Sequence, residues 1–139
     1  MTDAVVDASV VVKWAVAEEH SEQALALLKL RRLVAPAHWL SESVNAVWGK
    51  AHRGEITTSK AESAAGLLLG APVTSIPLAG LVKRALALSL ATGVTVYDTL
   101  YVALAFERGV EFITADRKLA RKFAGDPIGQ KLIIWVGDL

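Results

Sequence analysis

The chain has 139 residues, of which 53% are hydrophobic and 21% are charged, and its formal net charge is +1. The length predicts one domain, residues 1–139, with a substantial core, and the composition excludes an intrinsically disordered chain. Cysteine is absent, which excludes disulfides, thiol catalysis and cysteine-bound metal.

Signals for secretion and for membrane insertion are not found in the sequence. No basic segment precedes an apolar stretch at the N-terminus, so we expect no signal peptide. The longest apolar region, residues 82–106, is interrupted by Lys83, Arg84 and Asp98 and fails as a membrane span. The three histidines lack the paired spacing of a zinc site. We therefore expect a cytoplasmic protein without a membrane partner.

In chain order, apolar runs and helix-ending residues predict strands that are separated by helices. The expected strands cover residues 4–6, 33–36, 73–76, 111–114 and 132–136, the third being weakly specified. The expected helices cover residues 9–17, 21–32, 38–52, 58–70 (capped by Thr58 or Ser59), 81–91, 98–108 and a segment after Asp116. Strands joined through helices need crossover connections, so the fold class is α/β, with a parallel sheet covered on both faces.

Four carboxylates lie where this fold would gather them. Asp7 and Asp116 each follow an expected strand, Asp98 opens an expected helix, and Glu42 lies within another. Ligands of parallel α/β folds gather at the carboxyl ends of the strands, so topology alone places Asp7 and Asp116 at one edge of the sheet. A pocket that offers only carboxylate oxygens suits a hard divalent cation, Mg²⁺ or Mn²⁺.

Each acid also has a purely structural explanation. Asp7 and Asp116 fit the N-cap of the helix that follows each of them, and Asp98 fits the reciprocal acid of a capping box that begins at Thr95. Glu42 fits an exposed position on a helix surface.

Taken together, the acids favour a functional site. Carboxylates at one sheet edge repel one another and raise one another's pKa unless a cation neutralises them. Hydroxyl or amide groups lie two or three positions away from three of these acids and are expected to orient them through hydrogen bonds: Ser9, Asn45 and Thr114.

The chain resembles the PIN-domain family, in particular the VapC-type ribonuclease toxins of bacterial and archaeal toxin–antitoxin pairs. The resemblance covers nearly the full length. Four segments in order carry it: residues 5–10 (VVDASV), 41–46 (SESVNA), 96–105 (VYDTLYVALA) and 112–119 (FITADRKL).

This resemblance implies both an architecture and an activity. It implies an α/β/α sandwich with a five-stranded parallel sheet, a homodimer, an RNA substrate, and a small VapB-type antitoxin as inhibitor. In the family, the matching acids bind Mg²⁺ or Mn²⁺, so it also implies that Asp7, Glu42, Asp98 and Asp116 are the catalytic metal ligands. We expect direct binding by Asp7 and Asp98, with Glu42 or Asp116 accepting a proton from the attacking water.

Two basic residues close to the acids in sequence are candidates for binding substrate phosphates, Lys13 and Arg117. An ion pair with an active-site carboxylate explains Lys13 equally well. Two alternative functions fit the sequence less well. A binding module with the same fold would not need the intact acids, and a phosphatase of the Asp-x-Asp type is disfavoured because Ser9 occupies the second acidic position.

Overall fold

The structure is a computed structural model that describes all 139 residues. A five-stranded sheet runs through its centre and consists of β1 (Thr2–Val6), β2 (Arg31–Pro36), β3 (Val73–Ile76), β4 (Glu111–Thr114) and β5 (Ile133–Trp135). The strands lie in the order β3-β2-β1-β4-β5, and every neighbouring pair is parallel. The predicted parallel sheet is confirmed, including its weakly specified strand at residues 73–76.

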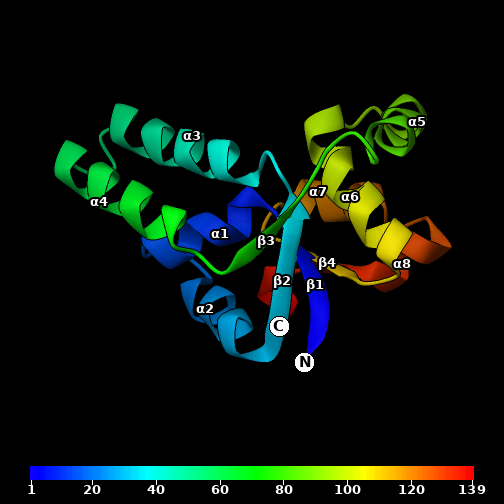
Figure 1. Cartoon of the computed structure of the whole chain (residues 1–139), viewed down its shortest axis with the longest axis horizontal. Coiled ribbons are helices and arrows are strands. Elements are labelled where there is room, and N and C mark those ends of the chain that lie inside the picture. The colour runs from blue at the N-terminus through cyan, green and yellow to red at the C-terminus, as the bar shows by residue number, and fades with distance from the viewer.

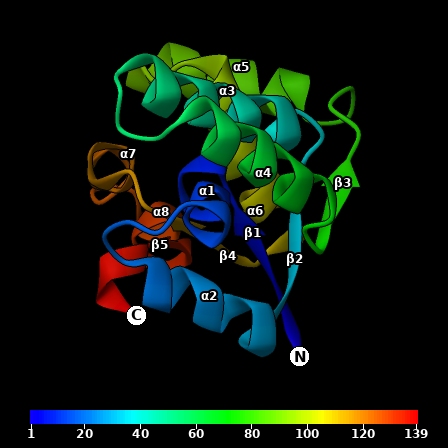
Figure 2. The same ribbon diagram turned by 90° about the vertical axis from the view of Figure 1, so that its left-hand side faces the viewer.

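Helices cover both faces of this sheet, as expected for an α/β/α sandwich (Figures 1 and 2). The helices are α1 (Ala8–Ala15), α2 (Ser21–Leu30), α3 (Trp39–His52), α4 (Thr58–Leu69), α5 (Val82–Thr92), α6 (Val96–Arg108), α7 (Arg117–Lys122) and α8 (Pro127–Leu132). Helices α1 and α2 pack on one side, and α6 packs across β1, β2 and β4 on the other. Helices α3 and α4 form a hairpin that packs against α1.

Strand β1 and helix α6 form the centre of the core. Ala4, Val5 and Val6 are fully buried, which agrees with a continuous apolar run rather than an alternating one for a strand covered on both faces. Seven consecutive residues of α6, Thr99 to Ala105, are also buried. The helix ends at Gly109, whose φ of +63° lies in the left-handed region that favours glycine.

The structure differs from the predicted elements at several boundaries. Helix α4 is capped by Thr57, whose hydroxyl accepts a hydrogen bond from the Lys60 N–H at 3.1 Å, so the predicted caps at Thr58 or Ser59 are wrong. Helix α8 was not predicted. Its signal lies in the sequence, because Asp126 caps the helix and Pro127 occupies its first turn, where the missing N–H of proline costs no hydrogen bond.

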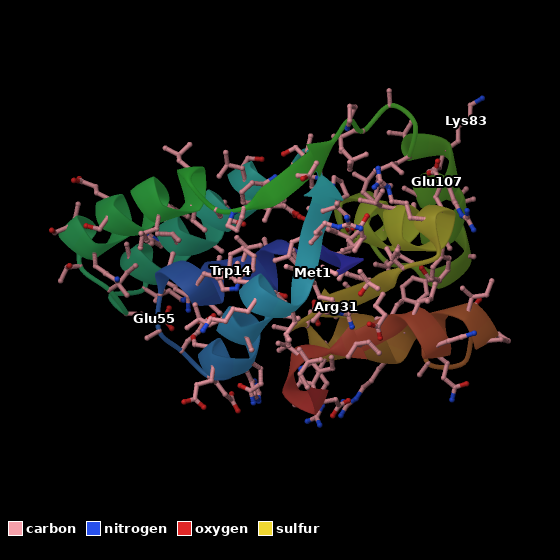
Figure 3. The ribbon with its side chains drawn as sticks, turned by 60° about the horizontal axis from the view of Figure 1, so that its bottom comes forward. Met1, Trp14, Arg31, Glu55, Lys83 and Glu107 are labelled. Carbon is pink, nitrogen blue, oxygen red and sulfur yellow. The ribbon has the colours of Figure 1, made fainter.

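The molecule is longer in one direction than in the others, and Glu55 and Lys83 lie toward its opposite ends (Figure 3). No single helix is both long and apolar enough to span a membrane; α5 and α6 pass that test only as a pair, and they are bent by 116° where they meet.

Candidate active site

The chain reverses its winding at β1, and the acids lie beside that point. Strands β2 and β4 flank β1, and the register Val6 to Ile113 places the ends of β1 and β4 next to each other. Asp7 follows β1 directly, and Asp116 lies two residues beyond the end of β4. This edge is where α/β folds of this kind bind ligands.

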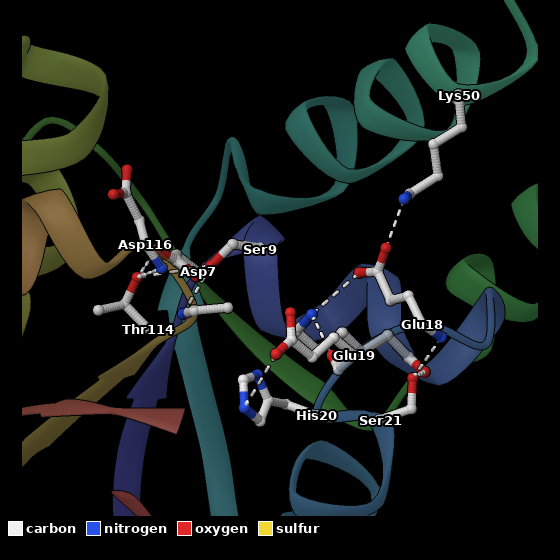
Figure 4. A network of polar contacts seen from close by, with 11 residues as sticks. Asp7, Ser9, Glu18, Glu19, His20, Ser21, Lys50, Thr114 and Asp116 are labelled. Carbon is white, nitrogen blue, oxygen red and sulfur yellow. Dashed lines mark hydrogen bonds and ion pairs between the residues drawn. The ribbon is translucent and has the colours of Figure 1, made fainter. Parts of the chain in front are cut away.

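Asp7 is held by two hydroxyl groups rather than by a helix end. The Ser9 hydroxyl donates to Asp7 Oδ1 at 2.5 Å, and the Thr114 hydroxyl donates to Asp7 Oδ2 at 2.6 Å (Figure 4). The Asp7 side chain makes no capping hydrogen bond to α1, although the residue occupies the N-cap position. The two hydroxyls therefore orient this carboxylate across the sheet edge, and the Val10 N–H of α1 has only the smallest effect on its pKa, so capping is a minor part of its role.

Ser9 and Thr114 also connect this carboxylate to the loop that carries Asp116. The Ser9 hydroxyl accepts a hydrogen bond from the Ala115 N–H at 2.9 Å, and the Thr114 hydroxyl accepts one from the Asp116 N–H at 3.0 Å. Segments about a hundred residues apart in sequence are thus joined directly around Asp7.

Asp98 and Asp116 have different local surroundings. The side chain of Thr95 makes no capping hydrogen bond, so the capping box proposed for Asp98 is not formed. Asp116 does cap α7, because its Oδ1 accepts a hydrogen bond from the Leu119 N–H at 3.1 Å. The structural explanation therefore holds for Asp116 and fails for Asp98.

Glu42 lies in the first turn of α3 and contacts residues of α6. The Tyr101 hydroxyl donates a hydrogen bond to Glu42 Oε1 at 2.6 Å, and His38 Nε2 lies 3.2 Å from the same oxygen. Glu42 is therefore not a free, solvated helix residue. Asn45, in contrast, is exposed and its side chain makes no hydrogen bond, so the orienting role predicted for it has no support.

The electrostatics show that the acids face one another. Burial raises the pKa of Asp7 to about 6, against the hydrogen bonds from Ser9 and Thr114, and the charge of Asp98 raises it further. Burial also raises the pKa of Asp98, and the charges of Glu42 and Asp116 add to this effect. Asp98 is thus the acid whose charge couples to those of the other three, Asp7, Glu42 and Asp116.

The group is nevertheless not a finished set of metal ligands. No three acidic or histidine side chains are arranged so that one ion could be held by all of them. The prediction of a preformed metal pocket is therefore wrong for this structure. Two carboxylates have other partners, since Asp116 caps α7 and Glu42 binds Tyr101. The chemistry still fits a hard cation, because all the donors are carboxylate oxygens. The pKa values of two of these carboxyl groups, Asp7 and Asp98, are raised.

A cavity of about 210 Å³ opens beside Asp98 and Asp116. Two lysines on one face of α7, Lys118 and Lys122, also line it. Neither lysine forms an ion pair, although both lie close to the acids in this cavity. The cavity thus combines acidic groups with free cationic ones.

The two basic residues chosen from the sequence have other partners. The Lys13 ammonium is buried and binds Glu18 at 3.2 Å and the Glu19 carbonyl at 2.6 Å, so the predicted pairing with an active-site carboxylate is wrong. The Arg117 guanidinium lies over the Trp135 ring, 4.1 Å from its centroid. Both were selected for proximity in sequence, which does not determine the direction of a side chain.

Four residues beside the acids were missed: His38, Tyr101, Lys118 and Lys122. A sequence signal existed for each of them. His38 precedes Glu42 by four positions and Tyr101 follows Asp98 by three, which places each on the same helix face as an acid. Lys118 and Lys122 are four apart, in the basic segment that follows Asp116.

Comparison with known proteins places this site in a family. The PIN domain matches residues 4–124. Ribonuclease VapC3 of Pyrobaculum aerophilum is 38% identical over 128 residues, which cover 86% of this chain and 93% of that protein.

Solved structures agree with this placement. The crystal structure of PAE2754 from Pyrobaculum aerophilum has a TM-score of 0.72 and 25% identity, and the match covers 99% of this chain and 85% of that one. VapC20 of Mycobacterium tuberculosis, a toxin that cleaves the sarcin–ricin loop, shares the fold with a TM-score of 0.64 at 18% identity, over 88% of this chain and 95% of that one. The resemblance seen in the sequence is therefore confirmed, and the chain belongs to the PIN-domain family.

Proposed function

We propose that this chain is a metal-dependent endoribonuclease and acts as the toxin of a toxin–antitoxin pair. Its membership of the PIN-domain family and its similarity to a ribonuclease support the reaction class. The observation that carries the proposal is the group formed by Asp7, Glu42, Asp98 and Asp116. Four separate segments deliver these acids to the edge where the winding reverses, and none of the four pairs with a lysine or arginine.

The chemistry follows from the charge of the substrate. A bound divalent cation supplies positive charge that offsets the phosphodiester and makes water easier to deprotonate. Asp7 and Asp98 are the residues that would hold it, because they are the carboxylates whose pKa values are raised by burial and by neighbouring acids. Ser9 and Thr114 keep the Asp7 carboxylate turned toward the site. We name Mg²⁺ as the cation, with Mn²⁺ as a substitute.

The remaining acids lie where a proton has to be accepted. Asp116 lines the cavity together with Asp98, so one of its oxygens is placed to take a proton from the attacking water, with Glu42 as the alternative. Lys118 and Lys122 replace Lys13 and Arg117 as the residues that would bind substrate phosphates, because they line the same cavity. In-line attack then leaves a 5′-phosphate and a 3′-hydroxyl.

The family resemblance supports the expected partners. A VapB-type antitoxin would block the active-site groove, and two copies of this single-domain chain would form a homodimer. An antitoxin that binds this groove would place positive charge near the four acids, since no lysine or arginine of the chain pairs with them and His38 contacts only Glu42, at 3.2 Å.

RNA cleavage tests the proposal, with the metal supplied as Mg²⁺ or Mn²⁺. We expect Asp7→Asn and Asp98→Asn to lower the cleavage rate by about 100-fold or more. The matched control is Asp3→Asn, which alters an acid at the opposite end of the same strand, where Asp3 pairs with Arg32 at 2.8 Å. If both site variants cleave as fast as the parent, the nuclease activity comes from a contaminant. The chain would then be a binding module with the same fold.

A further inference from the structure

Two helix starts meet beside the acids through a histidine that the proposed chemistry does not use. His38 immediately precedes α3, and its ring is largely buried, with its side chain 11% exposed. Its Nε2 lies 2.8 Å from the carbonyl oxygen of Tyr97 in α6 and 3.2 Å from Glu42 Oε1. One nitrogen therefore reaches both helices.

The chemistry of these neighbours fixes the position of the proton on the ring. A carbonyl oxygen only accepts hydrogen bonds, so Nε2 has to be the donor to Tyr97. Glu42 Oε1 lies 3.2 Å from the same nitrogen, at ion-pair distance, whereas the hydrogen bond of Nε2 goes to Tyr97. The other ring nitrogen, Nδ1, is buried and has no partner. The ring is thus held through Nε2 alone.

Tyr101 provides the hydrogen-bond donor to Glu42 Oε1. Its hydroxyl lies 2.6 Å from Glu42 Oε1, and its side chain is almost fully buried. Burial and the Glu42 carboxylate both raise the pKa of Tyr101, so the phenol keeps its proton and remains a donor. The Tyr101 ring packs against His38, with centroids 4.8 Å apart, and stacks on Phe112. This packing fixes where the hydroxyl points.

The contacts of Glu42 Oε1 with the Tyr101 hydroxyl and with His38 Nε2 have a consequence for the neighbouring acid. Glu42 and Asp98 carry like charges and raise each other's electrostatic energy, as the raised pKa of Asp98 shows. The hydrogen bond from Tyr101 and the close approach of His38 Nε2 hold the Glu42 side chain at this position and leave Oε2 without a contact from either residue. The hydrogen bond from His38 to the Tyr97 carbonyl joins the start of α3 to the turn that carries Asp98.

We propose that His38 and Tyr101 are positioning residues that hold Glu42 against α6, next to Asp98, for cation binding. This proposal rests on the proposed metal-dependent function. Neither residue touches substrate or metal in this account. A tyrosine that served only to fill the core would not need its hydroxyl, and a histidine that served only to pack would not need a donor at Nε2.

Substituting His38 with glutamine or asparagine distinguishes the roles of its two ring nitrogens. Glutamine places an N–H close to the position of Nε2, whereas asparagine places one close to Nδ1. Mn²⁺ binding to the purified full chain, followed by calorimetry, should therefore weaken about tenfold or more in His38→Asn and be largely restored in His38→Gln. Tyr101→Phe, which keeps the ring and removes the hydroxyl, should weaken binding to a similar extent.

A double-mutant cycle identifies the group through which His38 acts. In a Glu42→Gln background, His38→Asn should change Mn²⁺ affinity by less than about twofold, because its target no longer carries the charge. Thermal unfolding without metal identifies variants that fail to fold, and Tyr101→Phe then serves in place of His38→Asn. Metal-free ¹⁵N NMR should show the His38 proton on Nε2.

Several outcomes would overturn the proposal. Equal Mn²⁺ affinities for His38→Asn and His38→Gln would do so, as would a His38→Asn effect that persists in the Glu42→Gln background, or a His38 proton found on Nδ1. The nuclease proposal fails separately, when Asp7→Asn and Asp98→Asn cleave RNA like the parent. If the unaltered chain binds no Mn²⁺, both proposals fall.

Discussion

Two charged clusters lie at the two ends of α1, and their electrostatics are opposite (Figure 4). Near the C-terminal end of the helix, Glu18 pairs with Lys13 at 3.2 Å and also with Lys50 of α3. Burial acts to raise the pKa of Glu18, but the two lysines outweigh it and the pKa is lowered. At the N-terminal end, Asp7 has no cationic partner, and its pKa is raised to about 6.

The difference separates a cluster that stabilises the fold from one that serves a function. In the Glu18 cluster every charge lies against an opposite one, since Lys13 and Lys50 share the Glu18 carboxylate, and the contacts join α1 to α3. The Asp7 cluster is unbalanced, and its repulsion lowers the stability of the fold until a cation arrives. Unbalanced buried charge with a shifted pKa is typical of functional sites.

The largest expected effect is on the rate of RNA cleavage, and it distinguishes the Asp7 cluster from the Glu18 cluster most clearly. Asp116→Asn should lower RNA cleavage by about 100-fold, because it removes the proposed proton acceptor. Glu18→Gln should cleave within about twofold of the parent, because it lies outside the site. Single-turnover cleavage at saturating Mg²⁺ measures both variants. A Glu18→Gln loss as large as that of Asp116→Asn would contradict the division.

The second prediction concerns Asp7 and the stability of the metal-free fold. Because the pKa of Asp7 is about 6 in the folded chain and 3.8 by reference, ionising it at pH 7 destabilises the fold by about 3 kcal/mol. Asp7→Asn should therefore raise the free energy of unfolding at pH 7 by up to this amount, and Mg²⁺ should stabilise the parent more than the variant. Urea denaturation with and without metal measures both.

The sign of this effect reverses the usual behaviour of a paired carboxylate. The favourable contribution of Asp7 to the free energy of unfolding is fully present below about pH 4 and is lost as the pH rises through about 6. The difference in free energy of unfolding between Asp7→Asn and the parent should therefore shrink on acidification. An advantage that stays constant between pH 4 and pH 7 would show that the variant acts through packing and not through charge.

The third prediction is the converse, for Glu18. Glu18→Gln should lower the free energy of unfolding at pH 7 by about 1–3 kcal/mol, because the buried Lys13 loses its counter-charge. Since the pKa of Glu18 is lowered, its stabilisation is present above the reference value of 4.5 and is lost as the pH falls below it. The parent and the variant should therefore converge in acid, measured by urea denaturation. A difference that does not depend on pH would argue against the ion pair.

The smallest expected effect is on RNA affinity, and it distinguishes lysines without an ion-pair partner from a lysine that has one. Lys118→Ala and Lys122→Ala should each weaken RNA binding a few-fold and reduce the slope of log affinity against log salt by about 0.7, the value for one phosphate contact on a single strand. Lys50→Ala, which removes a lysine bound to Glu18, should leave that slope unchanged. Filter binding of a catalytically inactive variant measures the slopes.

Much of the fold could be predicted because it depends on local patterns and chain direction. The apolar run at residues 4–6 and the regular alternation with helices predicted a parallel sheet, and the structure has one. Helix α8 was missed because it is only six residues long, too short for helical periodicity to emerge. Its start still carried a readable signal in Asp126 and Pro127.

The candidate site could be predicted in part, for a similar reason. Ser9 was expected to orient Asp7 and donates a hydrogen bond to it. Thr114 was expected to orient Asp116, but its hydroxyl donates to Asp7, because the register of β1 and β4 places the end of β4 beside the end of β1. Asn45 was chosen by helix spacing alone and is exposed. Helix spacing gives a shared face but not the direction in which that face points.

The sequence by itself determined that Asp7 and Asp116 share one edge, because strands of a parallel sheet all end on the same side. Only the tertiary structure decided which side chains meet there. Tyr101 reaches Glu42 because residues near the starts of α3 and α6 contact each other, His38 lies one turn before Glu42, and Lys13 reaches Glu18 because the loop after α1 folds back. These contacts depend on the rotation and packing of helices, which sequence spacing does not specify.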